Sequence, residues 1–163
     1  MNRQEHKLRQ IIEKINVFNG FEVDEVQRLL FMCSPEKYAT GEVVYEADEP
    51  STNMLILLTG KLQVVSKTGE ILGEIPAGTA TGEIGILTGR PRSARVIALE
   101  PAAGMMIAKE DLSSLMGDLR IRAKVFENLV DQLCDRLLGA NQSIENYGKT
   151  TREGQEPEAD GEA

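Results

Sequence analysis

The sequence predicts an α+β domain, in which an antiparallel β-roll of the jelly-roll type, with about eight strands, is flanked by N-terminal helices and a long C-terminal helix. Three observations predict this class. The first residues carry apolar side chains at helical spacing, the region from Tyr38 to Lys109 consists of short apolar runs divided by turn residues, and helical spacing returns after Lys109. At 163 residues, the chain has the length of one domain with one core.

The N-terminal segment predicts two helices. Residues Arg3 to Ile15 form the first, with one buried stripe, and a turn follows at Asn16 to Gly20. The second helix covers Val23 to Cys33, and Pro35 is expected to end the helical part because it cannot continue a helix. The stripe of the first helix contains Leu8, Ile11, Ile12 and Ile15.

Short apolar runs then predict the strands of the roll. They are divided by turn residues such as Asp48 to Pro50, Thr68-Gly69 and Pro76 to Gly78. Evenly spaced strands with such turns are typical of a roll or sandwich. The expected strands are Val43–Tyr45, Met54–Leu58, Leu62–Val65, Ile71–Ile75, Ala94–Ala98 and Met105–Ala108.

The C-terminal part predicts a short helix from Lys109 to Met116 and a long helix from Asp118 or Leu119 to about Gly139. The apolar stripe of the long helix is wider than one packing face requires, so the helix can cover the roll and also serve a partner helix on its second side. We therefore expect a homodimer or docking onto an effector protein, with Val130 and Leu137 on the outward seam.

Residues 148–163 contain no large apolar side chain and are rich in acidic residues, which predicts a disordered acidic tail. The expected organisation is thus N-terminal helices in residues 1–36, the roll with its C-terminal helices in residues 37–147, and the tail in residues 148–163.

Composition excludes several classes of function. The net charge of −8 argues against a nucleic-acid partner, which requires clustered lysine and arginine. No apolar run reaches the ~20 residues of a membrane span, and the N-terminus is too polar for a secretory signal, so we expect a cytoplasmic protein.

Cys33 and Cys134 lie in apolar helical patterns and are expected to be buried, reduced thiols, and His6 is the only histidine. We expect no metal site and no cofactor apart from a bound ligand.

The most informative segment begins at Gly82. Gly82 and Gly85 remove side chains where backbone must come close to a ligand, and a short helix that begins near Ile84 directs its amides toward an anion. Glu83 can accept a hydrogen bond from a ribose hydroxyl.

Arg92 completes this segment, which ends in Pro91-Arg92-Ser93-Ala94-Arg95-Val96. An arginine binds phosphate oxygens bidentately and stays charged, which suits a phosphodiester site without a metal. Ser93 and Ala94 are small enough to leave their amides accessible. The alternative is that Glu83 and Arg92 form a structural salt bridge across a hairpin, but such a pair needs neither the glycines nor the run of small residues.

Residues Thr81 to Val96, T-G-E-I-G-I-L-T-G-R-P-R-S-A-R-V, resemble the phosphate-binding cassette of the cyclic nucleotide-binding domain family. The chain is similar to the sensor domain of the cyclic AMP receptor protein and to the regulatory-subunit domains of protein kinase A. The resemblance covers about Ile15 to Gly139, including the order of helices and strands. Thr81 stands where an aromatic residue is common, and Arg95 where a small residue is usual.

This resemblance implies that Glu83 binds the ribose 2′-hydroxyl, that Arg92 pairs with the cyclic phosphate, and that Ser93 donates to the phosphate or the base. From the positions of these residues we also expect a lid, in which the long helix, hinged near Gly117, closes over the purine when the phosphate binds Arg92. The candidates for the base contact are Asn141 first, then Gln142 and Tyr147. Ser93 is compatible with both cAMP and cGMP, and we take cAMP as the expected ligand of the two.

The resulting hypothesis is a single-domain cyclic nucleotide sensor, without a DNA-binding module, that signals to a partner protein through helix movement. The main alternative is an interaction or dimerisation module with the same fold and an empty or repurposed pocket. Enzymatic hydrolysis of a phosphodiester is not expected, because the segment offers no metal ligands and no general base beside Arg92.

Overall fold

The structure, a computed structural model, describes residues 6, 10 and 13–153, with residues 149–153 described in backbone only. The chain divides into two compact units, Met1–Leu129 and Val130–Ala163, and each is described by itself. The predicted first helix lies mostly outside the described residues. Within them, Glu13 and Lys14 form a turn, and a short 3₁₀ helix, η1 (Asn16–Phe18), occupies the expected turn.

Helix α2 (Val23–Phe31) begins with a reciprocal cap. The amide of Glu22 donates to the carboxylate of Glu25 at 2.8 Å, and the Glu22 side chain accepts from the backbone of the first turn. This arrangement satisfies amide groups that a helix start leaves without partners. The capping pair therefore fixes where the second predicted helix begins.

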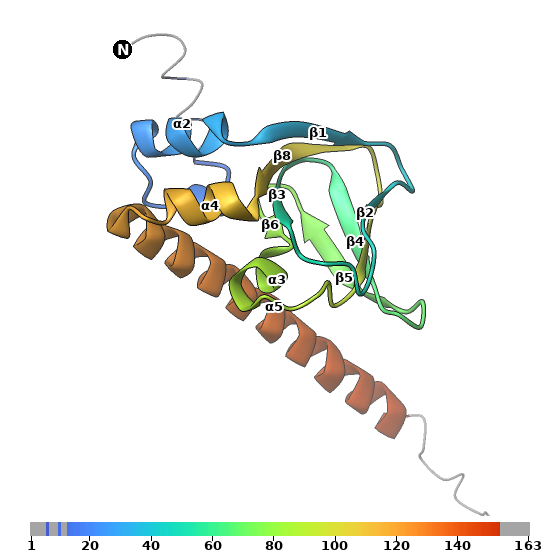
Figure 1. Ribbon diagram of the computed structural model, residues 1–163. Helices are drawn as coiled ribbons and strands as arrows, with labels where there is room; N and C mark the ends of the chain where they lie inside the picture. The colour runs from blue at the N-terminus through green and yellow to red at the C-terminus, as the bar shows by residue number, and fades with distance from the viewer. Residues whose placement is uncertain (1–5, 7–9, 11–12, 154–163) are drawn as a thin grey trace, which may run out of the picture. The chain divides into compact units, whose positions relative to one another are not determined.

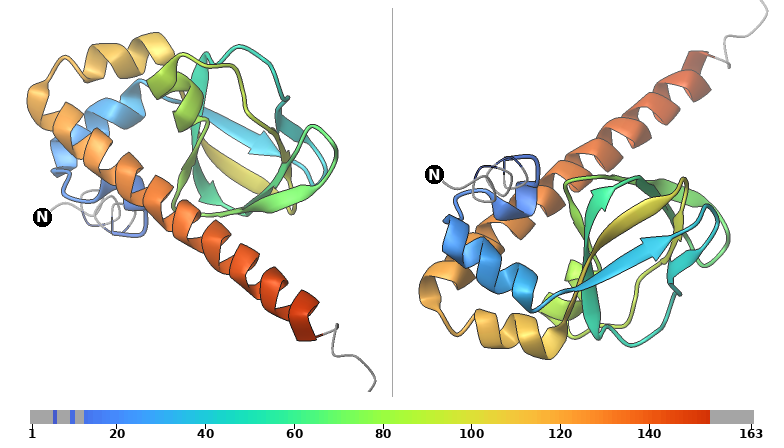
Figure 2. Two further views of the ribbon diagram at one scale, coloured as in Figure 1. Left: turned by 90° about the horizontal axis from the view of Figure 1, so that it is seen from below. Right: turned by 90° about the horizontal axis from the view of Figure 1, so that it is seen from above.

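The roll consists of two four-stranded antiparallel sheets. One sheet has the order β1 (Ser34–Tyr38), β8 (Ala102–Ala108), β3 (Asn53–Thr59), β6 (Ala80–Thr81). The other has the order β2 (Val43–Tyr45), β7 (Arg95–Ala98), β4 (Lys61–Val65), β5 (Ile71–Pro76). Figures 1 and 2 show the sheets wrapped into a roll, with α2 and α4 (Lys109–Leu115) at the end away from the β4–β5 hairpin.

Strand β3 explains why the domain has two apolar clusters. Met54 and Ile56 pack with the helices, whereas Leu55 and Leu57, on the opposite face, fill the inside of the roll. Side chains alternate between the two faces of a strand, so a strand buried on both faces needs a continuous apolar run. The run of β3 therefore joins the helical layer to the interior of the roll.

These elements confirm the predicted fold class and its strands, with two additions. Strand β1 was missed because Pro35 looked like a helix stop, but β1 lies at the edge of its sheet, where a proline without an N–H is tolerated. Strand β6 has two residues, too few to show a pattern. The boundary expected at residues 36 and 37 therefore falls inside β1.

The long helix α5 (Leu119–Glu153) begins as predicted but does not end near Gly139. Residues 148–153, assigned to the tail from sequence, are helical, and the rest of the predicted tail lies outside the described residues. A single glycine costs a helix only about 1 kcal/mol relative to alanine, so Gly139 weakens the helix without ending it. Both cysteines are free thiols, but Cys134 is exposed, which corrects its predicted burial.

Candidate functional site

The predicted ligand segment forms a tight loop and a short helix directly after β6. Gly82 has a φ of 89° and caps α3 (Glu83–Thr88), and Gly89, with a φ of 72°, ends it. A β-carbon on Gly82 would lie 2.5 Å from Nη1 of Arg92 and 3.1 Å from the carbonyl oxygen of Asn53. Glycine is therefore required at position 82 both by the backbone conformation and by the approach of Arg92.

Gly85 is also confined, but by the protein itself. A β-carbon there would collide with the side chain of Ser51 and lie 2.9 Å from the carbonyl oxygen of Arg90. The hydroxyl of Ser51 donates to that carbonyl at 2.8 Å. Gly85, which was expected to make room for a ligand, thus makes room for the loop before β3 to pack on α3.

Arg92 is almost completely buried, with 6% of its surface exposed. Its Nη1 donates to the carbonyl of Gly82 at 3.0 Å, and its Nη2 donates to the backbone oxygen and to Oδ1 of Asn53, at 2.6 and 2.9 Å. All three acceptors are neutral. A guanidinium has five N–H donors, so these three bonds do not exhaust it.

The backbone of Arg92 is fixed as well. Its amide donates to the carbonyl of Glu49 at 2.8 Å, and the amide of Asp48 donates to the carbonyl of Arg92 at 2.9 Å. Asp48 adopts a positive φ of 66°, which aspartate tolerates better than most residues. The loop before β3 and the segment before β7 are thereby joined on both sides of Arg92.

Tyr45, on β2, lies against the face of the guanidinium. Cζ of Arg92 is 3.7 Å from the centroid of the Tyr45 ring. The phenol is 5% exposed, and its hydroxyl donates to the carbonyl of Thr81 at 3.4 Å. Burial raises the pKa of Tyr45 well above its ordinary value, and this effect outweighs the opposing charge of Arg92. The ring is therefore neutral and fixed in place.

Glu83 is 1% exposed in the first turn of α3, directly after Gly82. A negative side chain in this position is favoured by the helix dipole. Ala94 is buried, whereas Ser93 and Ile84 are exposed. The structure thus brings Gly82 and Arg92 into contact, places Glu83 directly after Gly82 in the chain, and leaves Ser93 accessible.

The two departures from the usual cassette lie outside the contacts of Arg92. Arg95 points to Glu46 on the neighbouring segment, and the two form an ion pair of 3.2 Å. Thr81 is buried, and its carbonyl accepts from Tyr45. The residues expected to contact the base, Asn141, Gln142 and Tyr147, lie in the second unit on α5 and are exposed.

Sequence reasoning missed Tyr45 and Asn53, which hold Arg92. They come from β2 and β3, 47 and 39 residues before Arg92 in the sequence, and the sheets bring them together. The available signals were weak: an aromatic residue at the end of a short apolar run, and a polar residue directly before a buried run.

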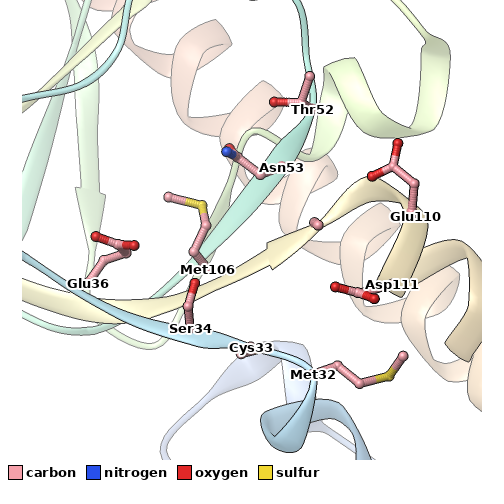
Figure 3. A pocket seen from close by; sticks show the side chains of 10 residues that line it. Met32, Cys33, Ser34, Glu36, Thr52, Asn53, Met106, Glu110 and Asp111 are labelled. Carbon is pink, nitrogen blue, oxygen red and sulfur yellow. The ribbon is translucent and has the colours of Figure 1, made fainter.

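A pocket of about 570 Å³ lies next to this site, and Asn53 contributes to both. Figure 3 shows its acidic lining, with Glu36 on one side and Glu110 and Asp111 on the other. Burial, with the charge of Asp111, raises the pKa of Cys33 to about 12, so its thiol stays protonated. Carboxylates repel a phosphate. The acidic pocket therefore suits a different kind of ligand from the cassette around Arg92.

Within the described part of the chain, no group of three His, Cys, Asp or Glu side chains is arranged to hold a metal ion. Nor does any helix described there combine the length and apolar character of a membrane span.

The β-roll thus places a glycine-capped short helix beside a buried arginine whose guanidinium is held by neutral acceptors. The model of the cyclic nucleotide-binding domain family matches residues 35–118, more than half of the chain, and the chain belongs to this family.

Several known proteins and structures are similar to this chain. The chain is 27% identical over 130 residues to glutaminase 1 of Bradyrhizobium diazoefficiens, covering 79% of this chain and 21% of that protein. It is 23% identical over 117 residues to the cAMP-dependent protein kinase regulatory subunit of Dictyostelium discoideum, covering 68% of this chain and 36% of that protein. The chain spans about a fifth of the length of the first curated relatives that it matches.

A solved cyclic nucleotide-binding domain from Methylobacillus flagellatus superposes with a TM-score of 0.76 at 23% identity, covering 89% of this chain and 84% of that one. At that identity the likeness shows the fold alone.

Proposed function

We propose that this domain binds a cyclic mononucleotide, cAMP in preference to cGMP, and that binding moves α5 and so signals to a partner protein. The single observation that carries the proposal is the environment of Arg92. Arg92 is 6% exposed, and its guanidinium is oriented by a backbone carbonyl, an amide and a phenol ring. Because these contacts are neutral, none of them cancels its charge, and a phosphodiester anion is the ligand that complements it.

Glu83 and the cassette backbone supply the rest of the ligand contacts in this proposal. Glu83 accepts a hydrogen bond from the ribose 2′-hydroxyl, and the amides around Gly82, Ile84 and Gly85 face the phosphate. Ser93, which is exposed, donates to the phosphate or to the base. Asn141 on α5 is our candidate for the base contact, and it is the residue on which the preference between adenine and guanine would depend.

The second unit supports the signalling step. Its part of α5 carries an apolar stripe in a seven-residue repeat, at positions a and d of a coiled coil. Val130, Leu137 and Ile144 are each more than half exposed, and Tyr147 is 77% exposed. The full stripe is Val130, Leu133, Leu137, Ala140, Ile144 and Tyr147.

A second copy of this chain fits the stripe. The acidic residues Asp131, Asp135 and Glu145 fall at positions b and f, away from the seam, so two copies would meet without facing carboxylates. We therefore propose a homodimer through α5, with the movement of α5 as the signal that an effector protein reads.

Calorimetric titration with cAMP, cGMP, a cyclic dinucleotide and 5′-AMP tests the proposed ligand class. We expect saturable binding of cAMP, weaker binding of cGMP, and little binding of 5′-AMP, whose phosphate is not cyclised. Binding of the cyclic dinucleotide alone would replace the ligand in this proposal. An absence of binding to all four would leave the alternative of an interaction module with a repurposed pocket.

A further inference from the structure

The contact between Tyr45 and Arg92 is the part of the site that neither the cassette motif nor its proposed ligand accounts for. Cζ of Arg92 lies 3.7 Å from the centroid of the ring, well within the roughly 6 Å over which a cation is attracted to an aromatic face. The attraction is strongest where water is excluded, and both residues are at least 94% buried.

Tyr45 is itself held firmly enough to orient another side chain. The ring belongs to the apolar cluster inside the roll, with Leu55 and Val96 among its members. Its hydroxyl is within hydrogen-bond distance of the carbonyl of Thr81 and, at 3.6 Å, of Sδ of Met106. The ring is thus fixed by strands of both sheets.

The remaining contacts of the guanidinium are of a different kind. Gly82 and Asn53 accept hydrogen bonds at its N–H edge, and a phosphate would use the same kind of donors. The ring occupies the face of the guanidinium and uses no donor. A phosphate can therefore replace an acceptor at the edge while the stack on Tyr45 persists.

We propose that Tyr45 is the positioning residue of the phosphate site, and that its ring holds the guanidinium of Arg92 in one orientation both before and after an anion binds. This inference rests on the proposed function for the role of Arg92, but the stacking itself can be observed in the free protein.

The first experiment compares Tyr45→Phe, which keeps the ring, with Tyr45→Leu, which keeps apolar volume without an aromatic face. Tyr38→Leu is the matched control, since Tyr38 is partly buried at the same cluster but belongs to β1. We expect cAMP affinity within about twofold of native for Tyr45→Phe and Tyr38→Leu, and about five- to thirtyfold weaker for Tyr45→Leu.

A second measurement needs no ligand. In the native protein and in Tyr45→Phe, arginine-detected NMR should show slow rotation about the Nε–Cζ bond of Arg92, together with a ring-current shift. In Tyr45→Leu the ring-current shift should disappear, and the rotation should become faster although the hydrogen bonds to Gly82 and Asn53 remain. If the native protein shows the slow rotation and the ring-current shift but binds no cyclic nucleotide, the proposed function fails while the positioning role stands.

If Tyr45→Leu does not fold, a second series of variants is used, in which Tyr45 is replaced by phenylalanine with increasing numbers of fluorine atoms. Fluorine weakens the negative face of the ring with little change of shape. We expect cAMP affinity to fall stepwise with fluorination. Equal affinity across the fluorinated series, or native affinity and slow Arg92 rotation in Tyr45→Leu, would overturn the proposal.

Discussion

Gly82 illustrates how the site depends on individual residues, because two separate constraints meet at its α-carbon. Its φ of 89° disfavours any L side chain, and a β-carbon would lie 2.5 Å from Nη1 of Arg92 and 3.0 Å from the hydroxyl of Tyr45. Gly89 provides a comparison, since it has a φ of 72° but no heavy atom within 4 Å of the position that a β-carbon would occupy. Substitutions at the two glycines therefore distinguish the effect of backbone strain from the effect of displacing Arg92.

We expect both Gly82→Ala and Gly89→Ala to lower the free energy of unfolding by about 1–3 kcal/mol, because alanine is strained at positive φ. Only Gly82→Ala should also weaken cAMP binding, by about tenfold or more, because it displaces the guanidinium. Urea unfolding and calorimetry measure the two effects. Equal binding by the two variants would show that Arg92 does not depend on the space at Gly82.

Glu83 leads to a prediction that combines a variant with a changed ligand. If Glu83 accepts from the ribose 2′-hydroxyl, Glu83→Gln should weaken cAMP binding by about 1.5–3 kcal/mol, the range for hydrogen bonds to charged groups. The same substitution should barely change the affinity for 2′-deoxy-cAMP, which lacks that hydroxyl. An equal loss for both ligands would assign Glu83 a role in the structure of the cassette only.

Among the elements, the strands were predictable and the ends of elements were not. The run Met54-Leu55-Ile56-Leu57 is buried on both faces, and its short length between turn residues indicates a central strand. Pro35 was ambiguous, because a proline stops a helix and also fits an edge strand, and the choice depends on sheet order. Gly139 was ambiguous in the same way, since the residues on either side of it favour a helix strongly enough to continue through it.

Polar contacts add to the shared apolar cluster in attaching η1 and α2 to the first turns of α5. Asn128 is buried and donates to the carbonyls of Val17 and Asn19, at 2.8 and 2.9 Å. Glu25 on α2 forms an ion pair with Lys124 on α5 and also accepts from the amide of Glu22. Burial raises the pKa of Glu25, but the contacts with Lys124 and the Glu22 amide outweigh burial and hold the pKa below its ordinary value of 4.5.

This pKa predicts how stability depends on pH. A carboxyl whose folded-state pKa is lowered stabilises the fold above its unfolded pKa, and the contribution is lost as the pH falls through the folded pKa. We expect Glu25→Gln to be less stable than native at pH 7, with the difference shrinking as the pH falls below about 4.5. Glu127→Gln, at an exposed position of α5, is the control. A stability difference that does not change with pH would contradict the assignment.

The second apolar face of α5 predicts self-association. Changing Val130 and Leu137 to glutamate should keep the fold and abolish the dimer, because both side chains are exposed within one copy and occupy the proposed seam. Leu138→Glu alters an equally exposed leucine outside the seam and should leave the dimer intact. Sedimentation at micromolar concentration, with and without cAMP, decides between these outcomes. A native protein that is monomeric in both conditions would exclude the homodimer.

For the whole molecule, the sequence located the cassette but not the residues that orient it. Glu83 and Arg92 lie within one short segment, and the spacing of two charged residues among small ones is visible in a single chain. Tyr45 and Asn53 reach Arg92 only because β2 and β3 lie in different sheets that face each other across the interior of the roll. Contacts of that kind depend on topology, and local patterns give only weak signals for them.

Because the molecule carries a net negative charge, we expect its binding of an anion to depend on Arg92. With a net charge of −8, the chain as a whole repels an anion, so binding of a cyclic phosphate must come from local contacts. The most direct test is therefore calorimetric titration of cAMP into the native protein and into Arg92→Ala, with circular dichroism to verify the fold. We expect the variant to lose about 2–4 kcal/mol of binding free energy, because a buried charged contact with the phosphate is removed. A correctly folded Arg92→Ala variant that binds cAMP as tightly as the native protein would contradict the account.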